Sequence, residues 1–545
     1  MEGNETPPAS LATLPVELGY HIATFLANRD IKSLRLTSSS LHDRFILRLK
    51  RVFVSASPLD IKVLKEIANH EVFRQGVTEI IWDESAFLPS IKHLNMHLGH
   101  YVCECNGSIR ELPRRKGNAG LPGRPDKATR QLASAMSRNE CEQLYCELVD
   151  EQDRILKAGE DIKAFKYALD RFPSLRRVTI STKTHGRLFM PMYETPMIRS
   201  FPYGFVYRVP TFRRNYDGWD SSILWRDEQS ENESKYSVYR RGVCSSLRVL
   251  AKHGSHKVSE FIIEDATPGT QDQLDYLSRF DNEDNAFGDL HSLIQRPGFS
   301  RLHLYAHGPM WHETLTKVEN LRGLRICGSG KSVDLKFRRC VMQSLQSLVL
   351  RRLKLEAHSF ITSVSPLTSL RCLVLDNLVF ANECRDGEEM RSYSSENPHD
   401  FLNALRENDW RSRSSRPNVT IKLISRFWVE GEMLKLDSDV DKFLYENGEN
   451  PFVPDDIEIH GRHCINLRED FEDICAGKGI ELDEYDPEYE RPNYDEETRE
   501  RLGIASTRKR NIERIYRSWG DGEWGPRTCP PDWKNRTQIL TMNSR

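Results

Sequence analysis

One spacing of apolar residues recurs along the chain and limits the folds that it can adopt. The frame is apolar-x-x-apolar-x-apolar, and four consecutive copies occupy 299–304, 321–326, 345–350 and 370–375. Successive copies begin 22, 24 and 25 residues apart. Alternating apolar residues predict a strand with one buried face. A strand that returns at a near-constant interval predicts stacked units, each of which buries its apolar face only against its neighbours.

The frame resembles that of leucine-rich repeats, which have a period of about 20–29 residues. Isolated copies occur at 77–82, 175–180, 258–263 and 419–423. The sequence between copies has the residue pattern of a helix, as at 356–364. Leu353 and Leu378 stand where that family usually has asparagine, which favours irregular repeats. The predicted fold class is α/β, with an irregular leucine-rich-repeat-like solenoid over 51–430. An ordinary α/β domain is the alternative.

A separate helical pattern precedes the repeats, after a lead of ten residues. Pro15 and Glu17 suit the first turn of a helix, Asp30 suits the N-cap of a second, and serines at 38–40 suit the start of a third. Three such helices within 11–50 carry more large apolar side chains than a unit below about 40 residues can bury alone. The remainder must pack on this chain or on another protein.

The run Leu14-Pro15-x-Glu17-Leu18, followed by Asp30-Ile31, closely resembles the F-box, and the resemblance covers about 11–50. It implies docking on a Skp-type adaptor and, through that adaptor, on a cullin-based ubiquitin ligase. The positions that match the family's contact pattern are Leu14, Pro15, Ile22, Leu26, Ile31 and Leu34. An ordinary three-helix cap on a larger fold is the alternative.

Two insertions interrupt the repeats, at about 106–140 and 185–245. Residues 106–130 are rich in glycine, proline and basic residues, which predicts a disordered loop. It lacks the interleaved aromatic residues that stack on bases, so we expect no nucleic-acid binding. Residues 141–172 regain helical periodicity up to Pro173. We expect that helix to pack on the convex side of the solenoid.

The second insertion carries eight aromatic residues within 201–225. Four of them alternate from Phe201 to Tyr207 and would share one face of an extended segment. The simpler interpretation is that these aromatic residues fill a local core of their own. Tyrosine and tryptophan are enriched in interface hot spots, so the alternative is a surface in which Tyr207, Tyr216, Trp219 and Trp225 bind a target.

The last part of the chain, 431–545, is predicted to be a charged and partly disordered extension. Residues 481–500 hold ten acids and two arginines, as expected of a solvated or acidic tail. Residues 508–517 contain a short basic cluster that resembles a nuclear import signal.

Two sequence patterns resemble a metal site and a nucleotide-binding loop, but neither motif is complete. His93, His97, His100, Cys103 and Cys105 lie close together, but structural zinc favours cysteines separated by two to four residues. Gly330-Lys331-Ser332 ends like a phosphate-binding loop, yet Arg325 stands where the first glycine is required. We therefore predict no cofactor and no enzymatic activity.

Composition narrows the class of function further. The formal net charge is −2, so no field over the whole chain attracts nucleic acid or an anionic membrane. Neither a signal peptide nor a membrane span is apparent, and we expect a cytoplasmic or nuclear protein. The leading hypothesis is a substrate-recognition subunit of a ubiquitin ligase, which binds the adaptor and a protein target. An F-box scaffold without ubiquitination of targets is second, and a metal- or nucleotide-dependent enzyme is third.

Overall fold

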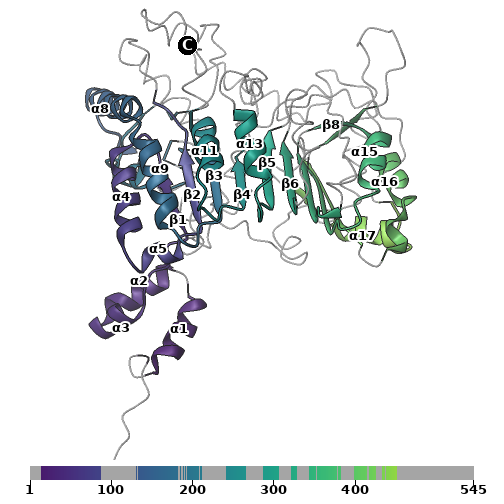
Figure 1. Ribbon diagram of the computed structural model, residues 1–545, viewed down its shortest axis with the longest axis horizontal. Coiled ribbons are helices and arrows are strands. Elements are labelled where there is room, and N and C mark those ends of the chain that lie inside the picture. The colour runs from purple at the N-terminus through teal and green to yellow at the C-terminus, as the bar shows by residue number, and fades with distance from the viewer. Residues whose placement is uncertain are drawn as a thin grey trace, which may run out of the picture.

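Figure 1 presents the chain as a computed structural model. The structure describes 11–87, 131–210, 241–264, 286–305, 321–327, 343–381 and 398–450, except for short gaps at 12–13, 27, 132, 182–183, 186–187, 190, 192, 208, 352, 377, 414–415, 425–432 and 436.

A single ten-stranded sheet forms the body of the described chain (Figure 1). Its strands follow sequence order, and every neighbouring pair is parallel except the last. They are β1 (Arg51–Val54), β2 (Glu79–Asp83), β3 (Arg177–Ser181), β4 (Glu260–Ile263), β5 (Arg301–Tyr305), β6 (Gly323–Cys327), β7 (Ser347–Arg351), β9 (Cys372–Asp376), β11 (Asn418–Ile424) and β12 (Met433–Lys435). Strands β8 (Lys354–Glu356) and β10 (Val379–Ala381) form a small separate sheet.

The recurring frame determines which residues meet across the sheet. Its second apolar position pairs Leu324 with Leu302 on one side and with Leu348 on the other, and Leu348 pairs with Leu373 in turn. All four side chains are buried. Equivalent positions of successive copies therefore stack in one layer, and the copies at 77–82, 175–180, 258–263 and 419–423 also become strands.

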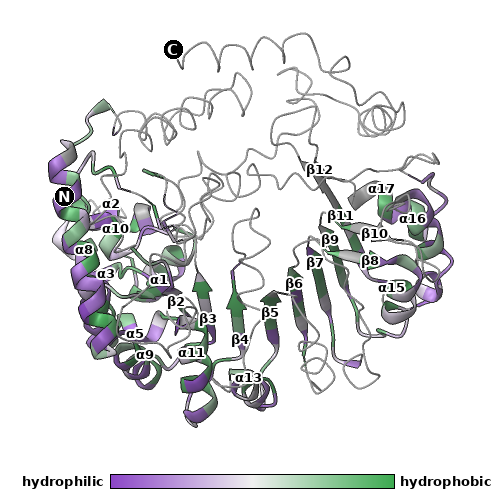
Figure 2. Ribbon diagram, turned by 90° about the horizontal axis from the view of Figure 1, so that it is seen from above, coloured by the Kyte–Doolittle hydropathy of each residue, from purple (hydrophilic) through white to green (hydrophobic). Residues whose placement is uncertain are grey.

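Helices cover the outer side of the curved sheet (Figure 2). They are α4 (Pro58–Asn69), α9 (Glu160–Arg171), α11 (Arg241–Lys252), α13 (Ala286–Ile294), α15 (Ala357–Val364), α16 (Pro398–Arg406) and α17 (Asp437–Tyr445). Their apolar faces and the buried strand positions make one continuous core that runs from Val52 to Leu444. The predicted helix at 356–364 is confirmed as α15, which Glu356 caps by accepting a hydrogen bond from His358 N–H at 2.9 Å.

The helical run predicted at 141–172 is broken in two. Helix α8 (Arg138–Ala158) ends at Gly159, whose φ of 62° lies in the left-handed region that glycine tolerates. Helix α9 then packs Phe165 into the main core, whereas α8 packs Tyr145 into a second cluster of buried residues. The apolar periodicity of 141–172 therefore did not reveal that the chain breaks at Gly159 into two helices.

The boundary predicted at residue 430 falls too early. Strand β12 pairs with β11 in the antiparallel sense, and α17 places Val440, Phe443 and Leu444 in the main core. This part of the chain belongs to the α/β fold, and 451–545 lie outside the described residues.

The α/β class is confirmed, with nine parallel strands in one sheet. The predicted solenoid is corrected to one continuous sheet. An arrangement as leucine-rich repeats stays a prediction, because strand order and register alone do not assign a repeat family. Within the described residues, no helix combines the length and apolarity needed to cross a bilayer.

Candidate interaction surfaces

The N-terminal segment forms three short helices, as predicted. They are α1 (Val16–Thr24), α2 (Asn28–Thr37) and α3 (Ser39–Arg44). Ser38 caps α3 by accepting a hydrogen bond from Leu41 N–H at 3.2 Å. Asp30 lies in the first turn of α2 rather than at its N-cap. These helices project beyond the end of the sheet at which the strands begin (Figure 1).

A small core holds the three helices together. Its buried members are Ala23, Ile31, Leu41 and Phe45. Arginines complete the unit: Arg35 Nη1 donates to the Phe45 carbonyl oxygen at 2.6 Å, and Arg44 donates to the carbonyl oxygens of Leu11 and Leu14. The position of α1 is thus fixed by polar contacts from α3.

Large apolar side chains stay exposed on this small unit. Seven large hydrophobic residues are exposed in the described part of the chain, and five of them belong to 16–36. We call these five the N-terminal apolar face: Val16, Leu18, Tyr20, Phe25 and Leu36. Phe25 is 77% exposed and Leu36 is 88% exposed. Because a helix has 3.6 residues per turn, Val16 and Tyr20 lie on one side of α1 and Leu18 on the other. The five are a local concentration of exposed apolar residues, of the kind that marks an interaction site, and not one contiguous patch.

The six predicted adaptor contacts do not all lie at the surface. Pro15 is exposed, and four are half-buried, namely Leu14, Ile22, Leu26 and Leu34. Ile31 is fully buried, and Leu26 and Leu34 pack against its cluster. The assignment of Ile31 as a contact is therefore corrected, because its side chain serves the internal core. The sequence pattern did not separate these residues from the exposed ones.

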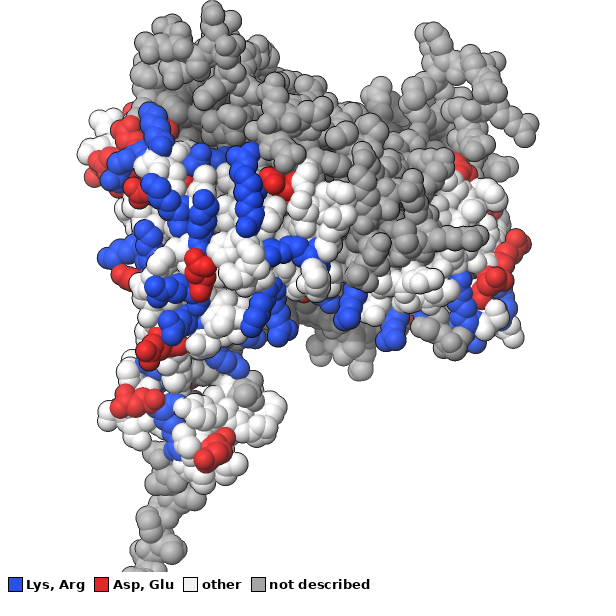
Figure 3. Space-filling view, viewed as in Figure 1, with Lys and Arg blue, Asp and Glu red and all other residues white. Residues whose placement is uncertain are grey.

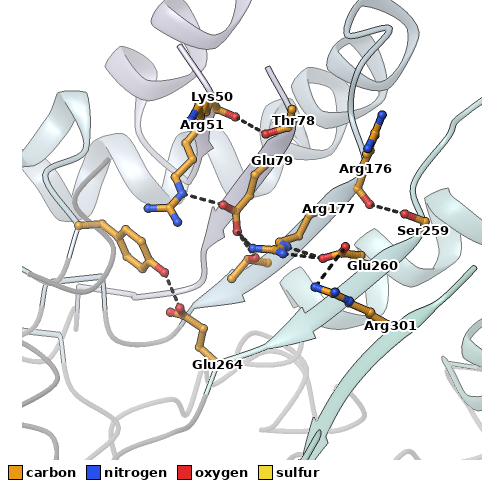
Figure 4. A network of polar contacts seen from close by, with 12 residues as sticks. Lys50, Arg51, Thr78, Glu79, Arg176, Arg177, Ser259, Glu260, Glu264 and Arg301 are labelled. Carbon is orange, nitrogen blue, oxygen red and sulfur yellow. Dashed lines mark hydrogen bonds and ion pairs between the residues drawn. The ribbon is translucent and has the colours of Figure 1, made fainter. Parts of the chain in front are cut away.

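A second surface lies at the beginning of the strands, where charged residues occupy one register across five of them (Figure 4). On each strand, the residue of this row pairs with the row's residue on the next strand. From β1 to β5 the row is Arg51, Glu79, Arg177, Glu260 and Arg301. We call this row the charged ladder. Glu79 accepts from Arg51 Nε at 2.7 Å, and Glu260 pairs with Arg177 Nη2 at 2.6 Å. Opposite charges on neighbouring strands stabilise their pairing.

The described residues of 184–209, which we call the strap, lie over the other end of β1, β2 and β4. Its Tyr193 packs on Ile81 and Phe53, and the Tyr193 hydroxyl donates to Glu264. Helix α10 (Pro196–Ser200) begins with Met197 N–H donating to Asp60 at 2.8 Å. The strap therefore covers the part of the sheet that it crosses.

Buried carboxyl groups lie beneath the strap. Burial raises the pKa of Asp60 to about 6, of Asp83 to about 7 and of Glu84 to about 8. Glu84 accepts from Gly242 N–H at 2.8 Å, at the start of α11. A Cβ on Gly242 would lie 3.0 Å from the Trp82 indole nitrogen, so glycine permits the close approach. Near pH 7, Glu84 is therefore mostly protonated, Asp83 is close to half protonated and Asp60 is mostly ionised.

His185 lies beside one of these carboxyl groups, Asp83, and is itself fully buried. Its Nδ1 lies 3.0 Å from the Tyr207 hydroxyl, and its Nε2 lies 3.8 Å from Asp83. Burial lowers the pKa of His185 to about 3, so the ring is neutral. Tyr207 is itself buried. Its predicted role in target binding is therefore corrected, because its hydroxyl and ring serve the interior.

The alternation predicted from Phe201 to Tyr207 holds only in part. Phe205 and Tyr207 stack with ring centroids 5.0 Å apart, and Phe201 meets both rings edge-on. Tyr203 points outward, because a turn at Gly204, with φ 81°, reverses the chain. This part of the insertion fills a local core. The other predicted target contacts, Tyr216, Trp219 and Trp225, lie outside the described residues.

Most of the predicted chemical motifs cannot be placed. The histidines and cysteines of 93–105 and the end of the phosphate-loop-like sequence lie outside the described residues. Among residues that are described, no group of three His, Cys, Asp or Glu side chains has an arrangement that could hold a metal ion. The buried cluster around His185 escaped sequence reasoning, since its members come from three distant segments.

Comparisons with known proteins add no relative. The chain matches no family model and no curated protein.

Proposed function

We propose that this protein is the substrate-recognition subunit of a ubiquitin ligase of the Skp-cullin-F-box type. The observation that carries the proposal is the N-terminal apolar face, in a segment whose sequence resembles the F-box. Five large apolar side chains, four at α1 and its C-cap and one on α2, are exposed in the isolated chain. Burying a large side chain contributes roughly 1.5–3 kcal/mol, so a partner that covers several of them gains substantial affinity.

The contacts that we propose for the Skp-type adaptor combine sequence and geometry. Leu14, Pro15 and Ile22 remain from the family pattern, and Phe25 and Leu36 are added on the ground of exposure. We assign Ile31 to the core of the unit. Leu26 and Leu34 support that core and present only part of their surface.

We further propose that the stacked strand-and-helix units are irregular leucine-rich repeats and that they receive the protein target. In support, equivalent leucines of consecutive frames pair in register across β5, β6, β7 and β9. Target contacts would lie on the part of the sheet that the strap leaves uncovered. The chemistry of ubiquitin transfer would belong to other subunits, and this chain would supply proximity.

Co-expression with a Skp-type adaptor tests the proposal. We expect the full chain to capture the adaptor, and the pair Phe25→Ala and Leu36→Ala to lose most of it while the melting temperature is kept. Val72→Ala is the matched control, because Val72 is an exposed apolar residue outside the N-terminal face. Equal capture by the wild type and the double variant would contradict the proposed surface.

Proteasome inhibition separates a receptor from an F-box scaffold. Proteins that co-purify with a receptor should accumulate when degradation is blocked, and the accumulation should depend on residues 11–50. Partners whose levels do not change would favour a scaffold that holds the adaptor without delivering targets.

A further inference from the structure

The end of the sheet at which the strands begin carries a row of exposed cations. Figure 3 shows lysine and arginine side chains along the lower border of the sheet region. We call this row the basic rim, and its members are Lys50, Arg176, Lys257, Arg301, Arg322 and Arg371. All six are exposed. Each begins a strand or lies within three residues before one.

Backbone hydrogen bonds between neighbouring strands fix the positions of the rim residues. The carbonyl oxygen of Arg176 accepts from Glu260 N–H at 3.0 Å, that of Arg322 from Ser347 N–H at 3.0 Å, and that of Arg371 from Asn418 N–H at 2.8 Å. The positive charges are therefore spaced by the sheet, with about 4.8 Å between neighbouring strands.

Nearby acids do not neutralise the rim. The glutamates of the charged ladder, Glu79 and Glu260, are occupied by Arg51 and Arg177. Of the rim residues, Arg301 approaches Glu260 at 3.8 Å, and the side chains of the other five form no ion pair within the described part of the chain. Five to six cations thus remain available on one edge of a protein with a net charge of −2.

We propose that the acidic segment 481–500 of the same chain binds the basic rim. The segment holds ten acids and two arginines, which gives 2 − 10 = −8, and the rim carries the opposite charge. The six rim residues include no aromatic side chain that would stack on bases.

Residues 451–480 join the described chain to the acidic segment, and this stretch is long enough to reach the basic rim. The described chain ends at Asn450, which is fixed on α16 by a hydrogen bond from its Nδ2 to Asn403 Oδ1 at 3.0 Å. The thirty residues of 451–480 span up to about 100 Å when extended. The eight strand steps from β11 to β1, beside which Lys50 lies, measure about 38 Å.

Attachment to the same chain favours this occupant over a separate acidic protein. Tethering to the same chain gives an effective concentration in the millimolar range, so several weak surface ion pairs suffice to keep the rim covered. An external acidic partner must then displace the segment, which makes 481–500 an internal competitor for this edge.

Zero-length carbodiimide cross-linking of the full chain, read by mass spectrometry, tests the contact. We expect amide links from Lys50 and Lys257 to carboxylates of 481–500. The variant with Arg322→Lys and Arg371→Lys preserves both charges and should gain links at these two positions. Raising the salt to about 1 M, where the screening length falls to about 3 Å, should suppress all of them.

Charge reversal gives the decisive comparison. Arg176→Glu with Arg322→Glu and Arg371→Glu should lower the links at Lys50 and Lys257 about fivefold or more, which corresponds to the loss of a few surface ion pairs. Links at Lys62 on the outer face of α4 should not change, and an unchanged melting curve would show that folding is kept. Links from 481–500 to Lys509 instead of the rim, links that survive charge reversal, or links only between different chains would overturn the proposal.

Discussion

Asn28 and Arg48 form a reciprocal pair of hydrogen bonds. Arg48 N–H donates to Asn28 Oδ1 at 2.9 Å, and Asn28 Nδ2 donates to the Arg48 carbonyl oxygen at 2.8 Å. Asn28 is buried at the start of α2, and Arg48 lies in the link that leads into β1. One amide side chain therefore joins the three-helix unit to the entry of the sheet.

Replacing Asn28 by alanine should loosen this junction. The backbone groups of Arg48 would lose their partners, which costs about 1–3 kcal/mol where such groups are buried. We expect faster hydrogen exchange across α1–α3 and unchanged exchange in α4 and β2. Ser40→Ala, at an exposed position of α3, is the control. Equal protection of α1–α3 in both variants would show that the junction contributes nothing.

The charged ladder should contribute to stability through Arg177, its middle member. Arg177→Leu removes the partner that Glu260 holds at 2.6 Å and a further contact to Glu79 at 3.9 Å. Because Glu79 is nearly buried and also accepts from Thr179, we expect a loss of about 1–3 kcal/mol in the free energy of unfolding by urea. A double-mutant cycle with Glu260→Gln should give a nonzero coupling energy. Strictly additive losses would contradict the ladder.

The free energy of unfolding should fall as the pH rises from 6.5 to 8. Burial raises the pKa of Asp83 to about 7 and of Glu84 to about 8, whereas unfolding returns both to near 4. The unfolded chain thus releases protons that the folded chain retains, and each retained proton lowers stability by about 1.4 kcal/mol per pH unit.

Histidine acts in a different window. Because the pKa of His185 is lowered to about 3, its contribution to the free energy of unfolding is complete above pH 6.5 and is lost as the pH falls toward 3.

The decline between pH 6.5 and 8 is tested at Asp83. Thermal melts of Asp83→Asn should show a flatter decline in this range than those of the wild type, because the variant lacks one of the two raised carboxyl groups. Parallel declines in the two proteins would exclude Asp83 as a source.

The repeating frame predicted most of the sheet, because a strand with one buried face leaves a local record in the sequence. Strand β1 was overlooked, although 49–54 fits the same frame with Leu49, Val52 and Val54 at its apolar positions. Apolar spacing also did not locate the end of α8 at Gly159, since both helices continue the same apolar period.

The sites were harder to predict than the strands. A helical stripe does not reveal which of its residues face a neighbouring helix, so Ile31 was assigned to the surface and Leu36 was overlooked. Tyr207 was assigned to the surface, but its hydroxyl is hydrogen-bonded in the interior to His185, which lies 22 residues away in the sequence. Such long-range polar contacts have no periodicity to read.

Two leucine variants should separate the core from the N-terminal apolar face. Leu348→Ala opens a cavity in a fully buried position of β7, and we expect a loss of about 2–5 kcal/mol. Leu36→Ala removes a side chain that already lies in water and should change stability by less than about 0.5 kcal/mol. Urea denaturation of both proteins measures the difference. A comparable loss at Leu36 would mean that this residue is buried in the folded chain.

Isothermal titration of the full chain with a purified Skp-type adaptor tests the central claim. We expect the wild type to bind, and Leu14→Ala with Pro15→Ala to weaken binding roughly thirtyfold or more, which corresponds to about 2 kcal/mol at a contact hot spot. The sheet should keep its melting behaviour, because its core lies apart from the three helices. A wild-type chain that binds no adaptor, or a double variant that binds equally well, would contradict the account.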